Sequence, residues 1–95
     1  MSYPVVLSSF ARALPPRKVT NADLSAMMDT SDEWIVQRSG IRERYWVEAP
    51  QTTSDLAAKA ASISVLRAGG GPVEAIIAAT LSPDYSFPGI GVQIQ

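Results

Sequence analysis

The stretch Glu74–Leu81, EAIIAATL, constrains the fold of this chain more than any other part of the sequence. It is almost continuously apolar, which is typical of a strand in a parallel sheet that is buried on both faces. The alanine-rich stretch before it, capped by Thr53 or Ser54 and running to about Ala68, has apolar residues at helical spacing. So many alanines indicate close packing on a flat surface such as a sheet. The two stretches together predict an α/β fold.

The glycines between these two stretches, Gly69–Gly71, come before Pro72. A phosphate-binding loop places its glycines after a strand and before a helix, and here the order is reversed. We therefore expect a helix end and a turn at this point.

Three shorter elements precede the alanine-rich helix. Tyr3–Ser9 has a β-branched apolar centre and predicts a first strand. Asn21 or Thr20 can cap a short helix that continues through Met28. Ile41–Val47 alternates apolar and charged residues before it turns aromatic, which predicts an exposed or edge strand.

A second short helix is expected between them. Thr30 fits the N-cap position, and Glu33 lies three residues on, as in a capping box. Gly40 supplies a left-handed stop, so the helix should run from about Ser31 to Ser39.

The candidate ligand-binding residues lie on this helix. Trp34 and Arg38 are four residues apart and therefore project from one face. A flat indole beside a planar, permanently charged guanidinium forms a slot for another flat ring, and the guanidinium could also contact phosphates. Taken alone, such a pair is more often a surface packing arrangement.

Composition excludes several classes of function. The net charge is −1, with 8 basic and 9 acidic residues, so no basic stripe for nucleic acid is present. No apolar run approaches the length of a membrane span, and we expect a cytoplasmic protein. The absence of cysteine and histidine leaves no thiolate or imidazole metal ligand. Capping and helix-dipole roles explain Asp29, Asp32 and Glu33, so no metal site is expected.

The run NADLSAMMDTSDEWIVQRSGIRERY resembles the N-terminal segment of the β-ketoacyl-acyl-carrier-protein synthase III family. The similarity extends through LPPRKVTN upstream and FPGIGVQIQ downstream. In that family the tryptophan and arginine of this run sandwich the adenine of coenzyme A. The resemblance therefore implies that Trp34 and Arg38 bind coenzyme A, with Thr30 as an additional contact.

The resemblance also implies a fold and a reaction for the intact protein. The fold would be the N-terminal part of a thiolase-like, layered αβαβα architecture. The activity would be that of an acyltransferase of fatty-acid biosynthesis, which condenses acyl-CoA with malonyl-acyl-carrier-protein by decarboxylating Claisen condensation. Acyl-CoA would be a substrate, and no separate cofactor is implied. A homodimer is implied, in which Phe87 reaches the subunit boundary or the partner's acyl pocket; core packing is an equally plausible role for this ring.

The family's chemistry uses a Cys nucleophile with His and Asn partners, and this chain has no cysteine or histidine. We therefore expect no catalytic residue here, and interpret residues 1–95 as a segment truncated inside a helix that begins near Pro88. The rest of the polypeptide would be a continuation or a second chain. Two alternatives stay open: a related thiolase-fold synthase making a quinolone, polyketide or acyl ester, or a non-catalytic fragment or subunit.

Overall fold

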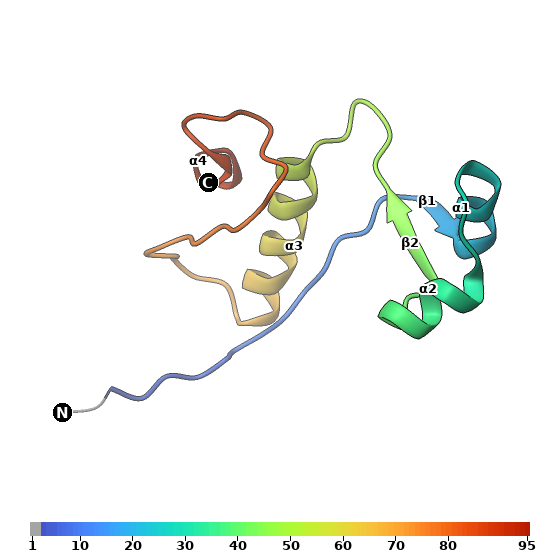
Figure 1. Ribbon diagram of the computed structural model, residues 1–95. Helices are drawn as coiled ribbons and strands as arrows, with labels where there is room; N and C mark the ends of the chain where they lie inside the picture. The colour runs from blue at the N-terminus through green and yellow to red at the C-terminus, as the bar shows by residue number, and fades with distance from the viewer. Residues whose placement is uncertain (1–2) are drawn as a thin grey trace. The chain divides into compact units, whose positions relative to one another are not determined.

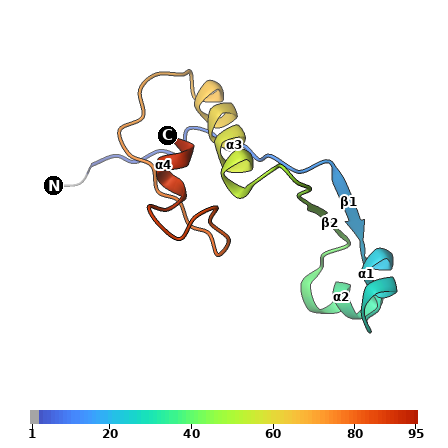
Figure 2. The same ribbon diagram turned by 90° about the horizontal axis from the view of Figure 1, so that it is seen from above.

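A computed structural model describes residues 3–95 (Figures 1 and 2). The chain separates into two compact units: a hairpin unit, Leu14–Pro50, and a helical unit, residues 3–13 together with Gln51–Gln95. The elements in chain order are β1 (Arg17–Thr20), α1 (Asn21–Met27), α2 (Asp32–Ser39), β2 (Glu43–Trp46), α3 (Thr53–Arg67) and α4 (Ile90–Ile94). Across the described residues, no helix combines the length and the apolar content needed to cross a bilayer.

In the hairpin unit, β1 and β2 pair antiparallel, and α1 and α2 occupy the connection between them. Arg17 lies opposite Trp46 and Val19 lies opposite Arg44. The strand β2 confirms the extended segment predicted over 41–47. Its partner β1 is missing from the sequence predictions, because Pro15 and Pro16, directly before it, indicate only an extended connector.

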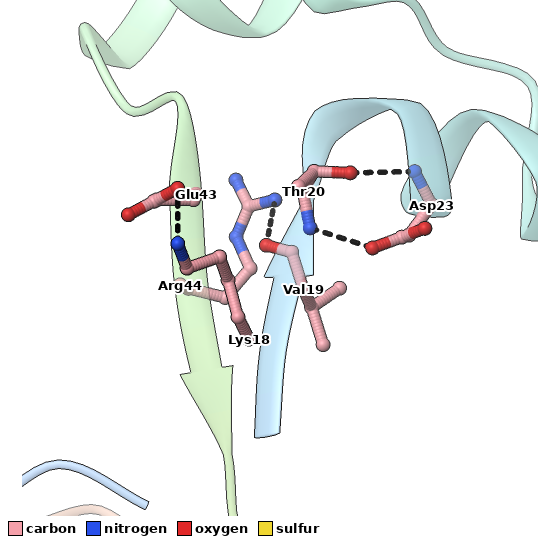
Figure 3. Close-up of polar contacts among 6 residues, drawn as sticks. All are labelled: Lys18, Val19, Thr20, Asp23, Glu43 and Arg44. Carbon is pink, nitrogen blue, oxygen red and sulfur yellow. Dashed lines mark hydrogen bonds and ion pairs between the residues drawn. The ribbon is translucent and has the colours of Figure 1, made fainter. Parts of the chain in front are cut away.

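The change from β1 to α1 occurs at Thr20, as Figure 3 shows. The Thr20 hydroxyl accepts from the Asp23 amide at 3.2 Å, and the Asp23 carboxylate accepts from the Thr20 amide at 2.8 Å. This reciprocal capping box satisfies two of the helix's free N–H groups. It also lowers the pKa of Asp23, first through the backbone N–H of Thr20 and then through its hydroxyl. Of the two predicted caps, Thr20 is therefore confirmed and Asn21 is not.

The start of α2 corrects a second prediction. Its N-cap is Ser31, whose hydroxyl accepts from the Trp34 amide at 3.1 Å. Thr30 therefore does not cap the helix. Both residues carry a hydroxyl, and the one used is decided by where the chain leaves the extended conformation. The predicted stop is confirmed, because Gly40 ends the helix with φ at 73°.

In the helical unit, α3 is capped by Thr52 in a second capping box with Asp55, so the predicted caps Thr53 and Ser54 are wrong by one and two residues. The end of α3 is as predicted: the three glycines that follow all have positive φ and form a turn. The extended N-terminal segment lies against α3, where the Ser9 hydroxyl donates to the Ser64 carbonyl at 2.6 Å. The side chain of Arg67 donates to the Phe10 carbonyl at 2.8 Å.

The two apolar stretches predicted as strands, Tyr3–Ser9 and Glu74–Leu81, are not strands here. The only sheet among residues 3–95 is the β1–β2 pair, so neither stretch has a neighbouring strand to accept its backbone hydrogen bonds. Their side chains are correspondingly exposed, with Ile77 at 97%. The last helix, α4, begins at Ile90 after the N-cap Gly89, so Pro88 precedes the helix and is not its first turn.

Candidate functional site

The candidate site is on α2 in the hairpin unit. Asp32 and Glu33 are in its first turn and Arg38 is in its last, which suits the helix dipole at both ends. The helical spacing brings Arg38 back over Trp34, with the guanidinium carbon 5.1 Å from the centre of the indole ring. Trp34 remains 55% exposed. The two residues that the sequence placed on one face are therefore in direct cation–π contact.

This contact changes the expected slot. A third ring between indole and guanidinium would need a separation of about 7 Å, twice the contact distance of carbon atoms. At 5.1 Å the two groups contact each other and the slot between them is closed. A planar ligand would have to stack on accessible indole surface, or displace the Arg38 side chain from Trp34.

A surface cavity of about 310 Å³ lies beside Trp34. Its lining residues are Asp29, Thr30, Ser31 and Trp34. Thr30 is freed from capping by Ser31, so its side chain is available to this cavity. The structure thus places Thr30 and Trp34 on one concave surface. Arg38 does not line this cavity but contacts the indole ring of Trp34.

One residue beside α2 was not predicted to have a role there. Asn21, expected only as an alternative helix cap, is 1% exposed, and its side-chain amide donates to Asp32 in the first turn of α2 at 2.8 Å. An asparagine at the start of a helix is ordinary in sequence, so no local signal distinguishes this buried role.

Phe87 lies in the helical unit and is 88% exposed. Its loop is fixed to the start of α3, because the Asp84 carboxylate accepts from both the amide and the hydroxyl of Ser54. These bonds lower the pKa of Asp84, the hydroxyl contributing most. The proposed role of Phe87 at a subunit boundary stays a prediction. Among the described residues, no group of three or more acidic side chains gathers to hold a metal.

No protein-family model matches the chain. Comparison with curated proteins shows 51% identity over 84 residues to the β-ketoacyl-[acyl-carrier-protein] synthase III of Paramagnetospirillum magneticum, covering 86% of this chain and 26% of that protein. The synthase III of Rhizobium johnstonii is 46% identical over 92 residues, covering 95% of this chain and 28% of that protein. The chain therefore spans less than a third of the length of these relatives.

Solved structures show the same correspondence. The 3-oxoacyl-[acyl-carrier-protein] synthase III of Aquifex aeolicus matches with a TM-score of 0.82 and 36% identity over 92% of this chain and 29% of that one. The synthase III of Thermus thermophilus matches with a TM-score of 0.75 and 42% identity, with 92% and 28% of the two chains covered. The predicted fold class, part of a thiolase-like α/β fold, is confirmed. In sequence and in fold, the chain matches the N-terminal portion of the β-ketoacyl-acyl-carrier-protein synthase III family.

Proposed function

We propose that this chain is the coenzyme A-binding portion of an acyltransferase that condenses acyl-CoA with malonyl-acyl-carrier-protein. The observation that carries the proposal is the half-exposed Trp34, in cation–π contact with Arg38 at 5.1 Å and beside a cavity lined by Thr30. The adenine would stack on the indole, and the Arg38 guanidinium would contact the phosphates or stack in turn on the base.

The chemistry would take place elsewhere in the intact protein. A cysteine thiolate would attack the acyl thioester and release coenzyme A. Malonyl-carrier-protein would then lose CO₂, and its carbanion equivalent would attack the acyl-enzyme, forming the new carbon–carbon bond and freeing the thiol. The part played by this chain is to hold a remote handle of the substrate, so that the thioester lies near the nucleophile.

The same proposal includes the assembly. We propose a cytoplasmic homodimer in which Phe87, so exposed in the single chain, is covered at the subunit boundary. An aromatic ring of this size is a common anchor in such interfaces. Acyl-CoA and acyl carrier protein are the proposed partners.

The test uses a full-length chimera, in which residues 1–95 replace the matching N-terminal segment of the Paramagnetospirillum magneticum synthase. The chimera should release coenzyme A from acyl-CoA and CO₂ from malonyl-carrier-protein in equal amounts. A chimera that folds and dimerises but has no turnover would contradict the proposal. Trp34→Ala in the chimera separates binding from chemistry: loss of a uniform binding contact should raise KM for acyl-CoA and leave kcat nearly unchanged.

A further inference from the structure

The helix that carries Trp34 and Arg38 has little apolar packing in the hairpin unit. None of the residues of α2 is buried, and only Ile35 and Val36 are half-buried. Apolar burial therefore contributes little to its orientation within this unit. Polar contacts have to fix the direction in which Trp34 points.

Those contacts converge on Asn21, at the junction of β1 and α1. Its side-chain amide nitrogen donates to Asp32 Oδ1 at 2.8 Å and to the Ile41 carbonyl at 2.8 Å. Asp32 is the first residue of α2, and Ile41 follows its C-cap, Gly40. One buried amide therefore holds both ends of the helix.

The strand β2 completes the arrangement. An amino group of the Arg44 guanidinium donates to Asn21 Oδ1 at 2.8 Å. A second one reaches the Val19 carbonyl at 3.5 Å, the contact drawn in Figure 3. The Asn21 backbone is also engaged, with its amide donating to the Arg42 carbonyl at 3.2 Å.

This set of partners fixes the amide in one orientation. Rotating it by half a turn would place its oxygen against Asp32 and the Ile41 carbonyl, and its NH₂ against the Arg44 guanidinium. Like groups would then meet at each contact. Asn21 itself is 1% exposed and has both donors and its acceptor satisfied by part-buried hydrogen bonds, so its side chain is held in one geometry.

We propose that Asn21 is a positioning residue for coenzyme A binding. It holds α2 by its two ends, in the orientation that presents Trp34 and Arg38 to the adenine. The inference rests on the proposed function, since it concerns the orientation of the same pair. Aspartate cannot replace Asn21, because the oxygen in place of the amide nitrogen would face both the Asp32 carboxylate and the Ile41 carbonyl.

The experiment measures KM and kcat for acyl-CoA in the full-length chimera. Asn21→Asp should raise KM about tenfold, within the range expected for a lost base–aromatic stack, and leave kcat within about twofold. The exchange variant Asn21→Asp/Asp32→Asn should recover part of the affinity, because the new amide at 32 donates to the new carboxylate at 21 and Arg44 keeps its acceptor, while the Ile41 carbonyl stays without its donor.

Val19→Ala is the matched control. Val19 is 1% exposed in the same unit, and its apolar side chain takes no part in the hydrogen bonds of Asn21 that hold α2. The Val19→Ala substitution should lower the melting temperature of the chimera and leave its KM for acyl-CoA unchanged. An unchanged KM in a folded Asn21→Asp variant overturns the inference. An exchange variant whose KM for acyl-CoA stays as high as that of Asn21→Asp also overturns it.

If Asn21→Asp does not fold, Arg44→Met carries the test. This milder change removes only the donor to Asn21 Oδ1 and to the Val19 carbonyl, and it should also raise KM. Failure of both variants to fold, while Val19→Ala folds, would assign the contacts to general stability and overturn the positioning role.

Trp34→Ala separates this inference from the proposed function. If Trp34→Ala also leaves KM unchanged, the coenzyme A site itself is wrong; if it raises KM and Asn21→Asp does not, only the positioning role fails.

Discussion

Residues 1–95 expressed alone should not fold cooperatively, and the size of the deficit follows from the two exposed apolar stretches. Five aliphatic side chains in them are between 79 and 105% exposed: Val5, Val6, Leu7, Ile77 and Leu81. Burying such a side chain contributes about 1.5–3 kcal/mol, so leaving all five exposed costs the folded chain about 7.5–15 kcal/mol of stabilisation. That loss is comparable to the whole net stability of a typical domain, roughly 5–15 kcal/mol.

The assay compares the isolated chain with the full-length chimera. Thermal unfolding followed by circular dichroism should show a broad, non-cooperative change for the isolated chain and a sharp transition for the chimera. The isolated chain should also bind a hydrophobic dye, tend to associate, and show no acyl-CoA turnover. A soluble monomer with a cooperative transition would refute the reasoning, because it would mean that these side chains need no further cover.

Three substitutions in the chimera test local features. Gly40→Ala should destabilise it by about 1–2 kcal/mol, because an alanine is forced into the left-handed conformation at φ 73°; equal urea midpoints would argue against this. Thr52→Ala should cost about 1 kcal/mol through loss of the α3 cap, seen as a lower melting temperature. The pKa of Asp84 is lowered in the folded protein, chiefly by the Ser54 hydroxyl. The ionised carboxylate should therefore contribute its full stabilisation of the fold above the ordinary pKa of an aspartate, and this contribution should be lost as the pH falls through the lowered pKa. The melting-temperature gap between the chimera and its Asp84→Asn variant should therefore close in acid; a gap independent of pH contradicts that assignment.

Features that depend on a few neighbouring residues could be predicted from the sequence. Gly40 ends α2 because only its own backbone conformation matters there. The placement of Trp34 and Arg38 on one face follows from the helical repeat alone. Caps were predicted less exactly, since Thr30 and Ser31 offer the same hydroxyl and the choice depends on where the backbone turns.

Features that depend on distant residues could not be predicted in this way. The strand β1 exists because Arg17–Thr20 meets β2 across two intervening helices. The Asn21 network draws its partners from positions 32, 41 and 44, and no spacing rule links them to a buried asparagine. The apolar pattern of Glu74–Leu81 predicts a buried strand correctly only where neighbouring strands exist to cover it. In the described chain they do not.

The central claim is that Trp34 and Arg38 bind the adenine end of coenzyme A. Isothermal titration of coenzyme A into the folded chimera tests it most directly, with Trp34→Ala and Arg38→Ala measured beside the parent. Trp34→Ala should weaken binding by about 1–3 kcal/mol, the scale of stacking one base on an aromatic ring. Arg38→Ala should also weaken it, through the lost cation–π and phosphate contacts. Unchanged affinity in both variants, with the fold intact, would contradict the account.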